Sequence, residues 1–169
     1  MNYEKALKLV ESHFGSDRIA RHCKATAAKA AEIALKIRAN GHRVDVEFVR
    51  TGALLHDIGR SRTHDIEHNY EGGRMLREMG LDRLARAVER HGGNIFDAIK
   101  PCDMTLEEKI IYLADKLTEE DGYVSLEERF ARVIARRRKD GREDEAVEIG
   151  RALDATRTID AEIKTLIQN

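Results

Sequence analysis

Apolar residues recur every three to four positions along most of this chain, which is the spacing of amphipathic helices. Glycines and short polar runs interrupt the pattern and predict where the helices end. We predict a first helix over about 2–14 that ends at Gly15, and a second that Ser16 or Asp17 caps and that stops near Asn40 and Gly41. A third helix is expected from Asp45 to about Ile58, with Gly59 ending it.

The rest of the chain continues this periodicity after a polar connection over about 60–68. Two further helices are predicted over about 70–79 and 82–91, followed by an irregular stretch to Asp103. Thr105 can cap the next helix, because Glu108 stands where a capping box needs its carboxylate. Two charged amphipathic helices are expected over about 125–167, with a break near Asp140 and Gly141. Period-two alternation is absent, so the predicted fold class is all-α.

Composition narrows the classes of protein that the pattern allows. A chain of 169 residues fits one domain and can bury a substantial core. The net charge of -1 creates no general basic field for nucleic acid. We find no signal-peptide core and no apolar run long enough to span a bilayer. Cys23 and Cys102 are too few for a disulfide framework, so we expect buried or half-buried thiols in a cytoplasmic protein with no membrane partner.

The pair His56-Asp57 is the first candidate for chemistry, because it closes the apolar segment 52–55 and should therefore lie inside the bundle. Burying an imidazole beside a carboxylate is costly unless something compensates their polarity. A divalent metal ion would do so, and a buried hydrogen-bonded His-Asp pair is the alternative. A second doublet, His64-Asp65, lies among polar residues and is expected to face solvent.

Two more residues add to this pattern. Asp115 follows five consecutive apolar residues, where a lone carboxylate is awkward, although it could also be the last exposed residue before the polar segment 116–120. His22 shares the inward face of the second helix with Ile19 and Thr26. Two imidazoles and two carboxylates from three helices would suit a divalent metal that prefers nitrogen and oxygen ligands. A cysteine-rich structural zinc site is excluded.

The order His22, His56-Asp57, Asp115 resembles the H…HD…D pattern of the HD superfamily of metal-dependent phosphohydrolases. The segment 55–60 is similar to the HDIG version, with Arg60 where a Lys or Arg usually stands, and 104–116 resembles the last metal-ligand helix. The resemblance spans about residues 20–120. It implies an HD-domain helical bundle that forms one domain over 1–169, with a metal-binding core at about 16–120 and a helical extension at about 121–169.

A narrower likeness concerns the number of metal ions. His68 and His91 match further ligands of two-metal members such as the bacterial symmetrical diadenosine tetraphosphatases. The comparison implies that these two histidines hold a second ion together with a bridging Asp57. His64 could replace His68, since both lie in the same polar loop. We therefore expect one or two divalent transition metal ions, namely Fe, Mn, Co, Ni or Zn, with Mg as a further candidate.

The resemblance implies hydrolysis of a nucleotide or another small phosphorylated substrate by metal-activated water. Asp57 is our candidate for orienting the attacking water or moving its proton. Arg60, Lys116 and His64 are candidates for binding phosphate, with ordinary surface charge as the alternative. The sequence does not distinguish a phosphomonoesterase, a phosphodiesterase or a pyrophosphohydrolase, and it predicts no oligomeric state.

Two other function classes remain open. Some HD-fold proteins, such as inositol oxygenases, use a di-iron centre with similar ligands for oxidation, and a regulatory module could bind a nucleotide without turnover. The basic run 136–139 could contact nucleic acid, but glutamates lie nearby and no aromatic platform accompanies it. We interpret this run as a solvated helix face and expect no nucleic-acid partner.

Overall fold

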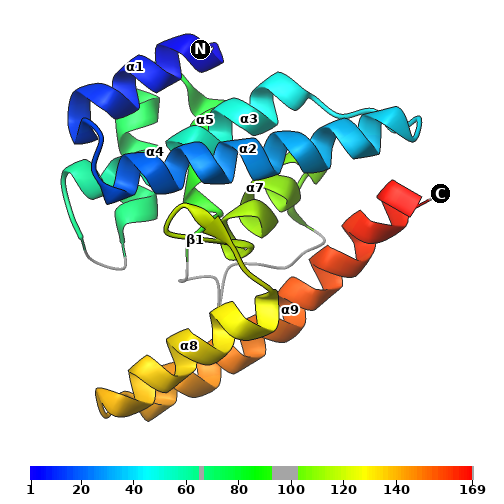
Figure 1. Ribbon diagram of the computed structural model, residues 1–169. Helices are drawn as coiled ribbons and strands as arrows, with labels where there is room; N and C mark the ends of the chain where they lie inside the picture. Colours follow the sequence, from blue (N-terminus) through cyan, green and yellow to red (C-terminus); the bar gives the residue numbers. More distant parts are fainter. Residues whose placement is uncertain (65–66, 93–102, 169) are drawn as a thin grey trace.

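The computed structural model describes residues 1–64, 67–92 and 103–168 (Figure 1). Within these ranges the chain is helical apart from turns and a minimal antiparallel hairpin, which confirms the all-α fold class. The helices are α1 (Tyr3–Phe14), α2 (Arg18–Ala39), α3 (Val46–Leu55), the 3-10 helix η1 (Ile58–Ser61), α4 (His68–Glu78), α5 (Asp82–Glu89), α7 (Leu106–Lys116), α8 (Leu126–Lys139) and α9 (Glu143–Gln168). The stretch predicted to be irregular, including Cys102, lies outside the described residues except for Asp103, and so does Asp65 of the second doublet.

Side chains at the predicted positions cap the helices. Asp17 and Asp45 each accept a hydrogen bond from the backbone N–H three residues later, at 2.9 and 3.0 Å. Thr105 and Glu108 form both hydrogen bonds of the capping box at the start of α7. These bonds satisfy backbone donors that have no partner inside the helix. The starts of α2, α3 and α7 were therefore predictable from local sequence, whereas α4 and α5 begin without a side-chain cap.

The end of α3 differs from the prediction, since the α-helix stops at Leu55 and not near Ile58. Residues His56 and Asp57 form a turn, and the chain continues as the short 3-10 helix η1. A Cβ atom on Gly59 would lie 1.9 Å from the carbonyl oxygen of His68 and 2.5 Å from the nitrogen of Gly72. Glycine is therefore required here because the backbone of α4 packs directly against η1. This packing places His56-Asp57 at the turn between the two elements.

A small hairpin joins α7 to α8. Strand β1 (Thr118–Glu119) pairs antiparallel with β2 (Gly122–Tyr123), with Thr118 opposite Tyr123. Strands of two residues carry no detectable period-two pattern, so the sequence did not predict them.

The hydrophobic core lies where α2, α3 and α7 meet, behind the turn that carries His56-Asp57. Figure 1 shows α2 crossing the middle of the molecule, with α3 and α7 against it. Fully buried side chains from these three helices include Ala30, Ile37, Leu54, Leu55, Ile110, Ile111 and Leu113. The turn that carries His56-Asp57 therefore rests on a closely packed apolar core.

The last two helices, α8 and α9, form an antiparallel pair that projects from the rest of the molecule (Figure 1). They break at Gly141, whose φ of 72° favours glycine, as the sequence predicted. The second half of α9 returns to the core. There the Tyr112 hydroxyl lies 2.7 Å from the Thr156 hydroxyl, and the Lys109 ammonium donates to both carboxylate oxygens of Glu162 at 2.7 Å. These contacts hold the pair of helices in place relative to α7.

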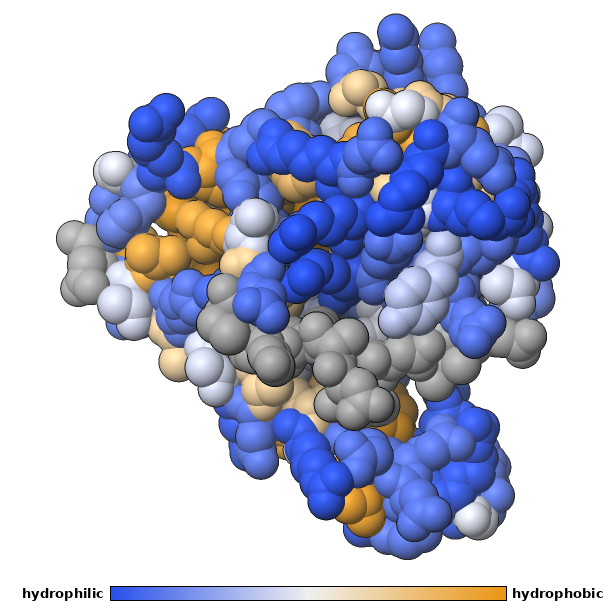
Figure 2. All heavy atoms as spheres, turned by 180° about the vertical axis from the view of Figure 1, so that it is seen from behind, coloured by the Kyte–Doolittle hydropathy of each residue, from blue (hydrophilic) through white to orange (hydrophobic). Residues whose placement is uncertain are grey.

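The face of the molecule in Figure 2 is mainly hydrophilic, and apolar atoms gather on it in limited areas. No helix within 1–64, 67–92 and 103–168 combines the length and the apolar character that crossing a membrane demands.

We expect Gly59→Ala to destabilise the fold, because the new methyl group would overlap the backbone of α4. Overpacking of this kind costs about 3 kcal/mol in the free energy of unfolding. The matched control is Gly150→Ala within α9, where an added Cβ meets no atom within 4 Å. That change should stabilise the helix by about 0.5–1 kcal/mol. Urea unfolding of the metal-free protein measures both, and equal stabilities would contradict the close approach of η1 and α4.

Candidate metal centre

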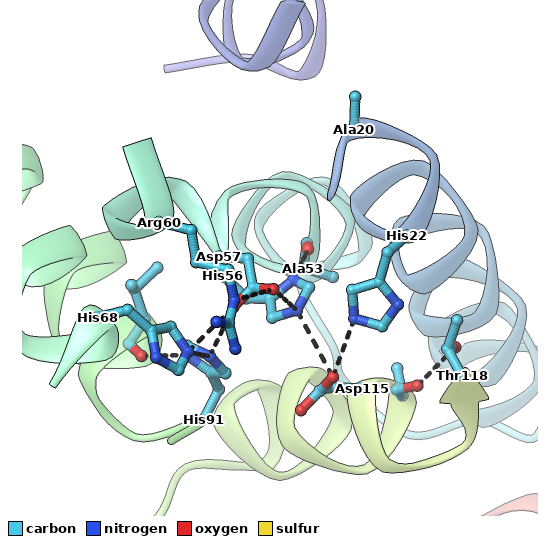
Figure 3. Close-up of polar contacts among 12 residues, drawn as sticks. Ala20, His22, Ala53, His56, Asp57, Arg60, His68, His91, Asp115 and Thr118 are labelled. Atoms are coloured by element: carbon cyan, nitrogen blue, oxygen red, sulfur yellow. Dashed lines mark hydrogen bonds and ion pairs between the residues drawn. The ribbon is translucent and has the colours of Figure 1, made fainter. Parts of the chain in front are cut away.

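The residues singled out in the sequence converge from separate elements (Figure 3). His22 lies on α2, His56-Asp57 in the turn after α3, and Asp115 one residue before the end of α7. The His22 Nε2 atom is 3.2 Å from Asp115 Oδ1, and the His56 Nε2 atom is 3.5 Å from the same oxygen. The His56 Nε2 atom is also 3.8 Å from Asp57 Oδ2. The structure therefore brings these four residues together, as the metal-site hypothesis requires.

A second group lies on the other side of Asp57. His68 is the first residue of α4, and His91 follows the end of α5. Their Nε2 atoms are 3.0 and 3.5 Å from Asp57 Oδ1, and 3.3 Å from each other. Asp57 thus faces His68 and His91 with one oxygen and His56 with the other, which is the placement expected of a bridging carboxylate.

Ligand atoms in these groups are close enough to share an ion. Among the described residues, two sets have potential ligand atoms all within 4.8 Å of one another: His22 with His56 and Asp115, and His56 with Asp57 and His91. Nitrogen and oxygen donors of this kind suit divalent transition metals. The arrangement could therefore hold one ion or two.

The orientation of three imidazoles supports metal binding. The Nδ1 atoms of His22, His56 and His91 lie 3.0, 2.7 and 2.5 Å from backbone carbonyl oxygens of Glu120, Ala53 and Val88. A carbonyl oxygen only accepts hydrogen bonds, so each Nδ1 must donate and the Nε2 atom is turned toward the centre. Metal-binding histidines are commonly oriented in this way by a hydrogen bond from their second nitrogen.

His56 gives the sharpest test of whether the residues fit a cation. Its side chain is 1% exposed, and its Nε2 atom is buried with no hydrogen-bond partner of good geometry among the described residues. The contact of 3.5 Å with Asp115 is an ion-pair distance, longer than a typical hydrogen bond. A buried nitrogen that faces two carboxylates without bonding to either is costly. A cation between them would remove that cost, so the residues fit the metal that the sequence implied.

The pKa values of the buried residues also indicate that this centre fits a cation. Burial raises the pKa of both Asp57 and Asp115, but their cationic neighbours outweigh burial and hold each pKa well below its usual value. Burial lowers the pKa of His56, but the two carboxylates overcome it and raise this pKa well above the usual value. Burial lowers the pKa of His91 to about 4. In the metal-free protein, a proton on His56 therefore supplies the charge that a metal ion would provide.

The predicted phosphate-binding cations are both tied to the centre. Arg60 Nε lies 2.8 Å from Asp57 Oδ2, and Lys116 Nζ lies 2.6 Å from Asp115 Oδ2. Their side chains keep 30% and 16% exposure, so both can still be reached from the cavity outside. His64 lines the same cavity and is exposed, whereas His68, which begins α4, contacts Asp57. The geometry thus favours His68 over His64 as a ligand.

The centre opens into a cavity of about 800 Å³. Its near wall includes the candidate ligands, and its far wall comes from α8 and α9, including Arg136 and Arg137. The basic run 136–139 is exposed apart from the half-buried Arg137. The sequence did not predict that Arg136 and Arg137 also line this cavity. Their local sequence resembles that of any charged amphipathic helix, so only the packing of α9 on α7 reveals where they point.

Cys23 also lies beside the centre, although the sequence gave it no role. The thiol is buried, as predicted, and burial raises its pKa despite contacts with His56. Its position next to His22 in the chain was the available signal. Of the other histidines in the described residues, His13 is exposed and His42 is partly exposed.

We expect metal content to depend on both groups of ligands. His22→Ala should remove the ion near Asp115, and His91→Ala should remove the ion near Asp57, each leaving about half of the metal if two ions bind. His13→Ala is the matched control, because this exposed histidine lies outside both sets. Elemental analysis of the purified variants measures the content, and unchanged metal in both site variants would contradict the assignment.

Metal binding should release protons at pH 7. The pKa of His56 lies well above 6.5 in the metal-free protein, so its proton is present at neutral pH and an ion must displace it. His91, with a pKa of about 4, is already neutral and releases none. Affinity should therefore rise with pH until the pKa of His56 is passed. Calorimetric titration with Zn²⁺ or Mn²⁺ in buffers of different ionisation enthalpy measures the release, and heats independent of the buffer would contradict it.

Several known proteins are similar to this chain in sequence. The uncharacterized protein MJ0778 of Methanocaldococcus jannaschii is 47% identical over 128 residues, covering 69% of this chain and 75% of that protein. Two proteins named tRNA (cytidine(56)-2'-O)-methyltransferase also match: one from Thermoplasma volcanium at 35% identity over 86% of this chain, one from Picrophilus torridus at 32% over 74%. The chain spans only 44% and 38% of these two relatives.

No solved structure matches the chain. The model of the HD domain family matches residues 19–120, a segment that begins just before His22 and ends just after Asp115. This match covers more than half of the chain and confirms the superfamily resemblance, while the narrower likeness to diadenosine tetraphosphatases stays a prediction. The protein belongs to the HD domain family.

Proposed function

We propose that this protein is a metal-dependent phosphohydrolase that acts on a nucleotide. The observation that carries the proposal is the placement of Asp57, which lies between two groups of histidines at the base of a cavity of about 800 Å³. A cavity of this volume is in the range of sites for small organic ligands. Family membership supports hydrolysis, because HD domains are typically hydrolytic and bind divalent metals.

A divalent cation, when bound, supplies Lewis-acid chemistry, which makes water more acidic and offsets negative charge on a phosphoryl group. The protein's own residues would complete the reaction. Asp57 would orient the attacking water and take its proton. Arg60 and Lys116 lie at the edge of the centre, where they can bind phosphate oxygens and stabilise the negative charge that develops in the transition state.

These two cations also favour hydrolysis over oxidation. A di-iron oxygenase could use similar nitrogen and oxygen ligands, but a phosphate ester is the substrate that paired Arg and Lys side chains beside a metal would recognise. We therefore place oxidation second among the chemistries of this centre.

A second candidate substrate is a phosphate carried by tRNA. It is favoured by the two relatives whose names state methylation of tRNA and which match 86% and 74% of this chain. The net charge of -1 argues against extensive contact with nucleic acid. A small nucleotide remains the leading candidate, and tRNA belongs in the same test.

The test is chromatographic analysis of the hydrolysis products of AMP, ADP, ATP, diadenosine tetraphosphate and tRNA after loading with Mn, Fe, Co, Ni, Zn or Mg. We expect turnover with at least one nucleotide and a loss of about 100-fold or more in kcat for Asp57→Asn, since positioned proton transfer contributes that much. Asp154→Asn is the matched control, because this carboxylate is exposed and pairs with Arg157, on α9. Oxygen uptake by the iron-loaded protein without hydrolysis of any of these substrates would overturn the proposal.

A further inference from the structure

The pair of helices α8 and α9 lies beyond residues 19–120, the segment that matches the HD domain. It nevertheless forms the far wall of the cavity above the metal centre. Figure 2 shows its projecting end as a mainly hydrophilic lobe, set off from the body of the molecule by a notch. Since Tyr112–Thr156 and Lys109–Glu162 anchor α9 to α7, the position of this wall relative to the centre is defined by the fold.

One face of each helix lines the cavity. On α8 this face carries Arg129, Val133 and Arg136, which recur at helical spacing. On α9 it carries Ile149 and Ala152. Val133 and Ile149 are only partly buried, so their side chains offer apolar surface to the cavity. An apolar strip therefore faces the same space as the metal centre.

The charges on this wall are mostly paired within it. Glu145 lies 3.4 Å from Arg137 and 2.6 Å from Arg142. Glu148 forms an ion pair with Arg151. These contacts neutralise both glutamates, so neither opposes an incoming anion strongly.

Arg136 is different. Its side chain is exposed and lines the cavity, and it makes no hydrogen bond or ion pair with any residue in the described parts of the chain. Its neighbour Arg138, by contrast, lies outside the cavity lining and is 3.1 Å from Glu143. Asp144 lines the same wall and likewise forms no ion pair among the described residues. Arg136 is thus a cation whose hydrogen-bond donors have no partner within 1–64, 67–92 and 103–168, and it faces a cavity that also contains Arg60 and Lys116.

We infer that the α8–α9 wall binds the part of the substrate beyond the cleaved phosphate, with Arg136 holding a second phosphate and the Val133–Ile149 strip contacting the nucleobase. The inference rests on the proposed function and deepens it. The implied substrate class is a nucleoside di- or triphosphate, or a dinucleoside polyphosphate, in preference to a simple phosphate monoester. A guanidinium suits this role because its planar donors match phosphate oxygens.

The test is calorimetric binding of three probes to the intact, metal-loaded protein: AMP, the β,γ-imido analogue of ATP, and inorganic tripolyphosphate. Binding needs no turnover, so it reports on the wall separately from catalysis. We expect the imido analogue to bind more tightly than either AMP or tripolyphosphate. Arg136→Ala should weaken binding of the imido analogue by about 10-fold, as expected for loss of a charge-assisted hydrogen bond, and change AMP affinity by less than about twofold.

Two variants control for general charge effects. Arg138→Ala removes the same charge from α8 outside the cavity and should leave all affinities unchanged. Asp144→Asn removes a negative charge from the wall itself and should tighten binding of the imido analogue, an effect of opposite sign. Arg136, Arg138 and Asp144 are all exposed, so we expect the three variants to fold and their affinities to be comparable.

The outcomes of these measurements distinguish the inference from its alternatives and from the proposed function. Equal losses for Arg136→Ala and Arg138→Ala would show unspecific attraction, and equal affinities for tripolyphosphate and the imido analogue would remove the role of the apolar strip. In the same assay with tRNA added as a fourth probe, Arg136-dependent binding of tRNA and of none of the other three probes would replace the nucleotide by RNA. Nucleotide hydrolysis with unchanged affinities in Arg136→Ala would refute the inference but keep the proposed function. Arg136-dependent binding without any hydrolysis would support the inference while refuting the proposed function.

Discussion

Two carboxylates buried among histidines are the constraint on which this structure depends. Asp57 and Asp115 are each 6% exposed, and burying such groups is unfavourable unless positive charge and hydrogen bonds surround them. His56 and His91, which follow the ends of α3 and α5, provide part of this charge and hydrogen bonding. There the last carbonyls lack partners within the helix and can accept the Nδ1 proton. The helix ends thus turn both Nε2 atoms toward the buried carboxylates, and a cation would complete the charge balance.

Close packing of α4 against its neighbours makes this arrangement possible. Gly59 lets the start of α4 approach η1, which brings His68 to 3.0 Å from Asp57. The Asn69 amide donates to the carbonyl of Glu89 at 2.7 Å and so fastens α4 to the end of α5, beside His91. The ligand candidates are therefore held by backbone contacts of the elements that carry them. This rigidity suits a centre whose donor atoms must keep fixed positions.

The helical core and the α8–α9 pair line opposite walls of the cavity. The core supplies the candidate metal ligands and the nearby cations Arg60 and Lys116, and these lie within the segment that matches the HD domain family. The α8–α9 pair supplies the opposite wall, with its apolar strip and Arg136. Chemistry and substrate selection would then reside in different parts of the chain, and a change in the outer helices could alter specificity without disturbing the metal centre.

The sequence alone determined the features that depend on local chemistry. Helix starts followed from capping residues such as Thr105, and the candidate ligands followed from polar residues placed at the ends of apolar segments, as with His56-Asp57 and Asp115. Contacts between distant segments were decided only by the tertiary structure. The choice of His68 over His64 beside Asp57, and the turning of Arg136 toward the cavity, depend on how α4 meets η1 and how α9 packs on α7. Helical periodicity specifies which face of a helix is buried, but it carries no information about which distant helix that face will meet.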